Sequence, residues 1–125
     1  MSLDAWAFEA LKIDKPWGHE LIWAQTDEYC GKVLFVRAGH ALSLQYHEVK
    51  DESWLVHGGR AELELGTLDG GERTVREIGP GDCFRFRPGT VHRVRALEDT
   101  TILEVSTPQL EDVVRLADEY GRTSS

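Results

Sequence analysis

The chain has few cysteines and no long apolar run, and each shortage excludes a class of protein. Among 125 residues only Cys30 and Cys83 are cysteines, too few and too far apart for a disulfide framework or a cysteine-based zinc site. We expect both to be free, buried thiols. No apolar run approaches the roughly 18 residues that a membrane-spanning helix needs, so a soluble protein without a membrane partner is expected.

Positive charge is also scarce. Acidic residues outnumber Lys and Arg by 22 to 14, which gives a formal net charge of −8 and a sequence pI of about 5.0. The broad basic face that binds nucleic acid is therefore not expected, whereas a local positive site inside an acidic protein stays compatible with this composition. The first residues lack the basic start and apolar core of a secretion signal, so we expect a cytoplasmic location.

The length predicts a single domain, because 125 residues can bury one core but not two. Residues 1–14 are expected to be peripheral, with Trp6, Phe8 and Leu11 in a docked helical turn or an extended arm. Residues 15–125 then form the domain.

Short strands dominate the pattern between residues 17 and 107. Segments rich in β-branched and aromatic residues alternate with Gly, Pro or Asp, which predicts an all-β sandwich or barrel. Residues 60–66 show the half-buried pattern, with Ala61, Leu63 and Leu65 on one face of the strand. The expected strands lie within residues 31–39, 54–59, 60–66, 73–79, 83–89, 91–97 and 100–106.

The pattern changes after Pro108. Leu110, Val113, Val114 and Ala117 recur at spacings of three to four residues, and acidic residues come early in the segment. This spacing predicts a short C-terminal helix or turn packed on the β-domain.

Four polar side chains converge in the predicted strands. Gln45 and His47 differ by two residues and so project from one face of a strand, while Glu52 begins the next strand and His92 begins a later one. Two imidazoles, a carboxylate and an amide suit one divalent metal ion (Zn, Mn, Fe, Co or Ni) with positions left for water or substrate. We therefore predict a metal site at these four residues. His19, His40 and His57 are expected to be ordinary surface or core histidines.

Residues 39–59 resemble the first motif of the cupin superfamily, G-x5-H-x-H-x3-4-E-x6-G. Gly39, Gln45, His47, Glu52 and Gly59 keep its spacing, and glutamine replaces the first histidine. The same replacement is found in the cupin branch of type II mannose-6-phosphate isomerases and in the matching domain of the enzymes fused to mannose-1-phosphate guanylyltransferase. The segments KPWGHELI (15–22) and LSLQYHEVKDESWLVHGGRA (42–61) are also similar to that branch.

A second cupin motif, G-x5-P-x-G-x2-H-x3-N, resembles residues 81–96. Gly81, Gly89 and His92 match it, whereas Arg87 stands in the proline position and Ala96 in that of asparagine. The tail EVSTPQLEDVVRLADEYGR (104–122) resembles the family's tail, with Ser106 for Gln, Pro108 for Gly and a shorter run before Glu111.

The resemblance implies an all-β cupin, a small jelly-roll-like β-barrel, with the metal in its mouth. It implies interconversion of mannose 6-phosphate and fructose 6-phosphate, an aldose–ketose isomerisation on a small-molecule sugar phosphate. Matching positions in the tail make Arg115 and Arg122 the phosphate-binding candidates and give Tyr120 a pocket role. Trp54 is expected to pack in the core and, because it shares a strand face with Glu52, is also a candidate to line the cavity and contact the substrate. Glu104 is the candidate for acid–base catalysis, and Arg115 is the second candidate catalytic residue.

Two matters stay open at this level. The same fold serves dioxygenases, epimerases and binding modules, so a free-standing metal-binding cupin that binds or converts another sugar or small anion is the alternative. Open sheet edges and the N-terminal arm favour a homodimer.

Overall fold

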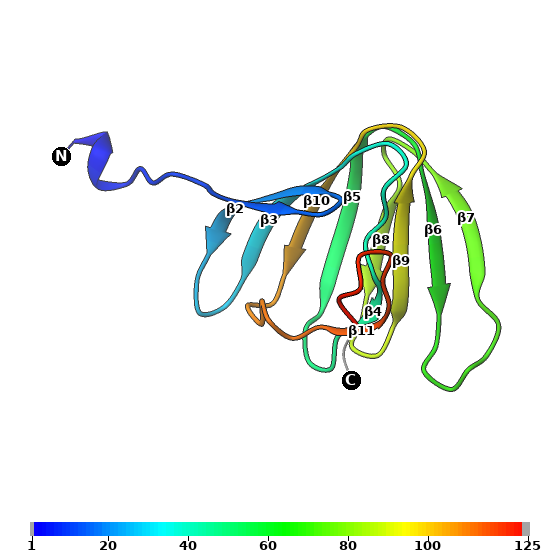
Figure 1. Cartoon of the computed structure of the whole chain (residues 1–125). Coiled ribbons are helices and arrows are strands. Elements are labelled where there is room, and N and C mark those ends of the chain that lie inside the picture. Colours follow the sequence, from blue (N-terminus) through cyan, green and yellow to red (C-terminus); the bar gives the residue numbers. More distant parts are fainter. Residues whose placement is uncertain (1, 124–125) are drawn as a thin grey trace.

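The computed structural model describes residues 2–123 as two antiparallel sheets packed face to face (Figure 1). The six-stranded sheet has the order β1 (Leu11–Lys15), β2 (Gly18–Gln25), β3 (Cys30–Val36), β10 (Thr100–Ser106), β5 (Glu52–Gly58) and β8 (Cys83–Phe86). The five-stranded sheet has the order β11 (Val114–Ala117), β4 (Leu44–Tyr46), β9 (Val91–Ala96), β6 (Ala61–Gly66) and β7 (Thr74–Ile78).

The all-β prediction is confirmed, but the sheets are not closed into the predicted barrel. Strands β1 and β8 end one sheet, and β11 and β7 end the other. A closed barrel requires its end strands to share hydrogen bonds, and these short end strands pair on one side only. The fold is therefore an open sandwich with a cavity between its sheets.

The predicted C-terminal helix or turn is wrong where the structure forms β11. Val114 pairs with Tyr46 and Arg115 with Gln45, across from β4, with a register shift before Ala117 (Figure 1). The apolar residues have a spacing typical of a helix. The β-branched pair Val113 and Val114 favours a strand, however, and the edge of β4 is available for pairing. This pairing brings Arg115 to the wall of the cavity.

The core and the polar site share one face of the six-stranded sheet. Ile102 pairs with Leu34 on β3 and with Val56 on β5, and all three side chains are buried. Two residues along β10, Glu104 pairs with Lys32 and Trp54 on the same strands. Because side chains alternate across a strand, the inward face is apolar at one end and carries charge at the other.

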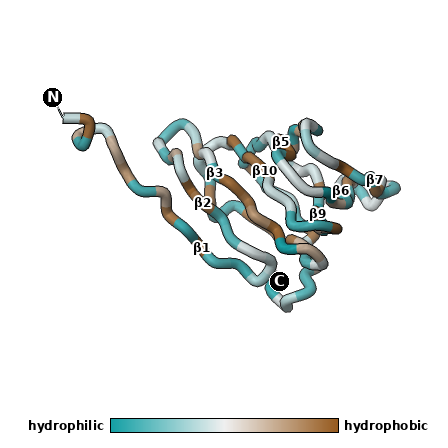
Figure 2. Tube along the Cα trace, turned by 90° about the horizontal axis from the view of Figure 1, so that it is seen from above, coloured by the Kyte–Doolittle hydropathy of each residue, from teal (hydrophilic) through white to brown (hydrophobic). Residues whose placement is uncertain are grey.

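The N-terminal segment was predicted to be either a docked helical turn or an extended arm, and the structure has the extended arm. A 3-10 turn, η1 (Leu3–Ala5), lies away from the sheets, and an exposed arm connects it to β1 (Figure 1). The proposed boundary between residues 14 and 15 falls inside β1. Seen from above, hydrophobic stretches lie along β3 and β10, and β1 at the edge is largely hydrophilic (Figure 2). No helix among residues 2–123 is long and apolar enough to cross a membrane.

The two cysteines differ in their surroundings. Both are free, as predicted, and Cys30 is buried in β3. The prediction that Cys83 is buried is wrong, because it starts the end strand β8 opposite Leu55, on the outer face of the sheet.

Candidate metal centre and cavity

Three of the four predicted ligands meet in the structure. His47 follows β4, Glu52 begins β5 and His92 lies in β9, and one ligand atom from each lies within 4.8 Å of the others. Glu52 Oε1 is 3.1 Å from His47 Nε2 and 3.0 Å from His92 Nε2. All three residues are buried, so the cluster sits inside the sandwich.

The hydrogen bonds of the two imidazoles determine what their inner nitrogens can do. His92 Nδ1 donates to the Thr90 carbonyl over 2.9 Å, and His47 Nδ1 donates to the Asp112 carbonyl. A carbonyl oxygen only accepts, so each Nδ1 carries a proton, and a ring that holds this single proton has its lone pair at Nε2.

Both lone pairs face Glu52 Oε1, which is itself an acceptor. His92 Nε2 is buried and has no hydrogen-bond partner within residues 2–123. Acceptor atoms that converge in this way are stabilised only by a cation between them, either added protons or a metal ion. Two imidazole nitrogens and a carboxylate are suitable ligands for a transition-metal or zinc ion, so the residues present fit the predicted metal.

Asp112 holds the turn between the first two ligands. Its carboxylate accepts the backbone N–H groups of Glu48, Val49 and Lys50 at 3.1, 2.7 and 2.8 Å. Burial alone would raise the pKa of Asp112, but these hydrogen bonds outweigh it and lower that pKa. Because its carbonyl also accepts from His47, this one residue fixes both the ring orientation of a ligand and the path of the chain to Glu52.

Lys50 lies fully inside the sandwich beside the cluster. Its Nζ is 3.2 Å from Glu52 Oε2 and 3.1 Å from Glu104 Oε2, and its side chain is 3% exposed. Burial by itself would lower the pKa of Lys50, but the two carboxylates hold it well above its usual value. The ammonium is therefore a permanent charge that occupies Glu52 Oε2 and leaves Oε1 to the imidazoles.

Burial acts on the two carboxylates with different outcomes. It would raise the pKa of Glu52, but the close contacts of its carboxylate with the two imidazoles and the charge of Lys50 leave that pKa well below its ordinary value. In Glu104, burial and the nearby charge of Glu52 raise the pKa in spite of Lys32 and Lys50. Glu104 is thus the carboxylate of this pair that takes up a proton more readily.

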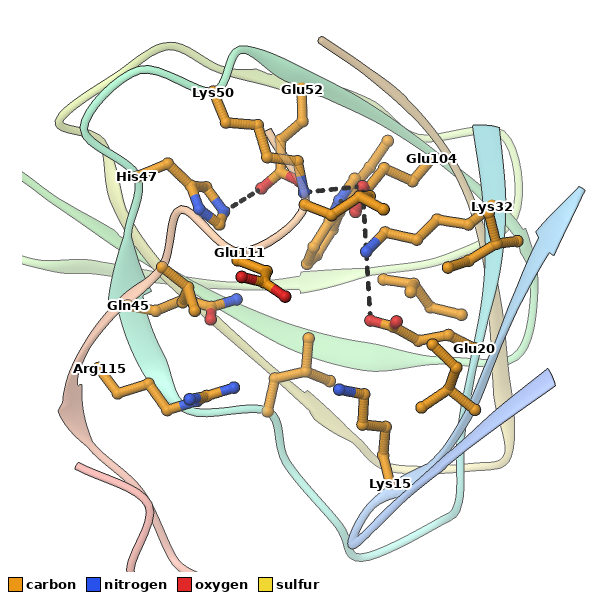
Figure 3. Close-up of a pocket in the computed structure, with 17 residues that line it drawn as sticks. Lys15, Glu20, Lys32, Gln45, His47, Lys50, Glu52, Glu104, Glu111 and Arg115 are labelled. Atoms are coloured by element: carbon orange, nitrogen blue, oxygen red, sulfur yellow. Dashed lines mark hydrogen bonds and ion pairs between the residues drawn. The ribbon is translucent and has the colours of Figure 1, made fainter. Parts of the chain in front are cut away.

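The cluster forms one side of a cavity of about 310 Å³ between the sheets (Figure 3). Charged residues line much of the cavity wall. Lys32 Nζ continues the row of ion pairs, 3.7 Å from Glu104 and 3.2 Å from Glu20. The charged side chains that line the cavity are Lys15, Lys32, Lys50, Arg115, Glu20, Glu52, Glu104 and Glu111.

Gln45 and Trp54, two further predicted site residues, also line this cavity. Gln45 lies opposite His92 in the β4–β9 pairing, and its Oε1 accepts from Ser43 Oγ over 3.1 Å. Trp54 is 2% exposed, and its Nε1 donates to Glu104 Oε1 over 3.0 Å. Gln45 as fourth ligand and Trp54 as a substrate contact stay predictions.

The residues predicted from the tail separate in the structure. Arg115 lines the cavity, whereas Arg122 lies in a smaller adjoining space of about 50 Å³. Arg122 is held by Asp118, with Nε 2.9 Å and one terminal nitrogen 3.0 Å from its carboxylate oxygens. The Tyr120 hydroxyl is 2.7 Å from His40 Nδ1, so this tyrosine is occupied by a contact within the chain.

Several residues that line the cavity were missing from the sequence-based set. Lys15, Lys32, Lys50 and Glu111 all face the cavity, together with Glu20. Parity could have placed Lys32, since it alternates with Leu34 in β3, whereas Lys50 lies in the turn before β5, where strand alternation does not apply.

The sequence of the chain is similar to those of known proteins. A family model described as a cupin domain matches residues 32–106. Mannose-1-phosphate guanylyltransferase of Escherichia coli (strain K12) is 30% identical over 116 residues, which cover 89% of this chain and 23% of that protein. The chain thus spans about a quarter of the length of the curated relatives it matches.

Solved structures agree on the fold. KdgF from a Halomonas species is 28% identical with a TM-score of 0.67, over 81% of this chain and 88% of that chain. Oxalate decarboxylase from Bacillus subtilis superposes with a TM-score of 0.75 at 18% identity, over 92% of this chain and 32% of that chain. The latter similarity concerns the fold alone.

Proposed function

The chain belongs to the cupin family, and we propose that it is a metal-dependent sugar-phosphate isomerase that interconverts mannose 6-phosphate and fructose 6-phosphate. The observation that carries the proposal is the convergence of two imidazole lone pairs and a buried carboxylate beside a cavity whose wall carries both cationic and anionic side chains. The likeness to a mannose-1-phosphate guanylyltransferase supports a mannose phosphate as substrate, although only 23% of that relative is matched.

The proposed cofactor is one divalent ion, Zn, Mn, Fe, Co or Ni, held by His47, Glu52 and His92 with Gln45 as the fourth ligand. When bound, the ion supplies positive charge next to the reacting carbonyl group of the sugar. Asp112 and Lys50 keep the ligand atoms in place through the contacts described above.

An aldose–ketose isomerisation also needs a group that removes a proton from the carbon beside the carbonyl and returns it to the neighbouring carbon. Glu104 was predicted for this role, and its raised pKa supports it. Its two oxygens are, however, in contact with Trp54, Lys50 and Lys32. Glu111, which points into the cavity (Figure 3) and makes no ion pair among residues 2–123, is a second candidate for the proton transfer.

The remaining proposed contacts belong to substrate binding. Arg115 reaches the cavity directly and is proposed to bind the phosphate group, which a guanidinium contacts through two parallel hydrogen bonds. Trp54 contributes an apolar wall. Arg122 and Tyr120 are proposed to shape the tail that carries Arg115, since both already have partners within the chain.

A second function is a cupin that binds or converts another sugar or small anion without this isomerase activity. The similarity to KdgF favours it, because it extends over 88% of that chain and so over a protein of comparable size. A homodimer is proposed for either function, since the exposed N-terminal arm and the end strands offer surfaces for a second copy.

Metal analysis combined with an isomerase assay tests the proposal. The purified protein is stripped with a chelator, reloaded with each of the five ions, and assayed with mannose 6-phosphate. Turnover that disappears with the metal and returns with one of the ions is expected. Stoichiometric metal without turnover would reject mannose 6-phosphate and favour the second function.

A further inference from the structure

We propose that Lys15 and Arg115 form a subsite for a phosphate monoester on the side of the cavity that faces the His–Glu–His cluster. The proposal adds Lys15 as a substrate-binding residue and rests on the proposed function. Lys15 is the last residue of β1, paired with Gly18 of β2, and Arg115 lies in β11 of the other sheet. Figure 3 shows the two side chains reaching into the cavity from different walls.

Lys15 differs from the other lysines of the cavity in having no carboxylate partner. Lys32 and Lys50 each contact two carboxylates. No ion pair is made by Lys15 within residues 2–123, although its side chain is half-buried and lines both the larger and the smaller cavity. Its ammonium group therefore has no counter-charge among the described residues, and an anion that enters the cavity can pair with it.

The charge of the cavity indicates how much negative charge it can take. Its lining side chains carry four positive and four negative charges, so they balance before any metal is present. One divalent ion would leave an excess of two positive charges. A phosphate monoester carries about −1.5 to −2 at neutral pH, which matches that excess better than a single carboxylate does.

Arg122, the second arginine predicted to bind phosphate, is poorly placed for direct contact. Its Nε and one terminal nitrogen donate to Asp118, and its backbone N–H donates to the same carboxylate over 2.8 Å. Lys15 faces the same small cavity as Arg122 and Arg115 and has its donors available. The structure therefore gives the position beside Arg115 to Lys15.

Replacement of Lys15 by Met tests the subsite in the full-length, metal-loaded protein. Calorimetric titrations use four probes: inorganic phosphate, mannose 6-phosphate, mannose and glucuronate. Lys15→Met is expected to weaken binding of the two phosphate probes by about 10- to 100-fold, the effect of one charge-assisted hydrogen bond, and to leave mannose unchanged. Lys12→Met is the matched control, since Lys12 lies on the same strand with a 58% exposed side chain.

Each outcome decides a separate point. Equal binding of phosphate and mannose 6-phosphate by Lys15→Met and the unmodified chain overturns the subsite, as does the absence of phosphate binding to the unmodified chain. Dependence of glucuronate, but not phosphate, on Lys15 overturns the assignment to phosphate monoesters. Lys15-dependent binding without turnover keeps the subsite and rejects the isomerase, whereas turnover that does not depend on Lys15 does the reverse.

Discussion

Replacement of Lys50 by Met would leave two buried carboxylates without their shared counter-charge. Met nearly matches the volume of Lys, so the change removes charge and hydrogen bonds while it keeps most of the packing. Glu52 and Glu104 then repel each other inside the sandwich, with Lys32 the closest remaining cation, 3.7 Å from Glu104.

The expected loss of stability is large. At 3.1 and 3.2 Å, each contact of the ammonium has a gross attraction of roughly 5 kcal/mol at an effective dielectric constant of 20. Most of this offsets desolvation, and removal of one partner of a buried ion pair costs about 3–5 kcal/mol. For a chain of this length, that loss lowers the unfolding temperature by about 10–20 °C.

The deficit of Lys50→Met should also depend on pH. Lys50 opposes the rise in the pKa of Glu104 that burial and Glu52 cause, so its removal raises that pKa further above the ordinary 4.5. A carboxyl group with a raised pKa in the folded state stabilises the fold below the unfolded pKa and loses that contribution as the pH rises. Relative to the unmodified protein, the variant is therefore expected to be less stable at pH 8 than at pH 5.

Thermal and urea unfolding of the metal-free protein, followed by tryptophan fluorescence at pH 5 and pH 8, measures both effects. Lys12→Met, on an exposed position, should change the free energy of unfolding by less than about 0.5 kcal/mol. The double variant Lys50→Met/Glu104→Gln should recover part of the loss, because it removes the second buried charge. Equal unfolding of Lys50→Met and Lys12→Met at both pH values would refute the reasoning.

Three further predictions concern the ligands, a turn and the tail. His92→Ala should lose bound metal by elemental analysis while unfolding remains cooperative; full occupancy would contradict its role as a ligand. Gly59→Ala should lower the free energy of unfolding far more than Gly39→Ala, since both have positive φ but only at Gly59 would a Cβ lie 2.3 Å from a backbone oxygen. Arg122 lowers the pKa of Asp118, so the stability that this ion pair contributes should be lost as the pH falls below about 4. Asp118→Asn should remove this pH dependence in acid unfolding. An Asp118→Asn variant with the same acid unfolding curve as the unmodified protein would contradict the prediction.

Alternation along the strands made much of the site predictable. The two-residue spacing and the matching motifs located His47, Glu52 and His92, and the structure brings these three together. His57, expected to be an ordinary histidine, differs from Glu52 by five residues and so lies on the other face of β5, where it is exposed. The proximity of these residues therefore follows from local strand geometry together with the family motifs, and both can be read from the sequence.

Contacts between distant segments were not predictable in the same way. The segment with Val113 and Val114 has a spacing that suits a helix, and only the open edge of β4 selects a strand. Lys15 and Lys50 look like surface lysines until the pairing of β1 and the turn before β5 direct them inward. The local spacing of residues does not reveal which sheet edge a distant segment joins.

The three backbone contacts of Asp112 have a consequence for the order in which the protein is assembled. All predicted ligands lie at or before residue 92, yet the turn that joins two of them takes its shape from a residue twenty positions later. During synthesis the ligands leave the ribosome before Asp112 does. The ligand turn is therefore completed only when the tail docks, so capture of the metal would report that folding of the chain has reached its last strand.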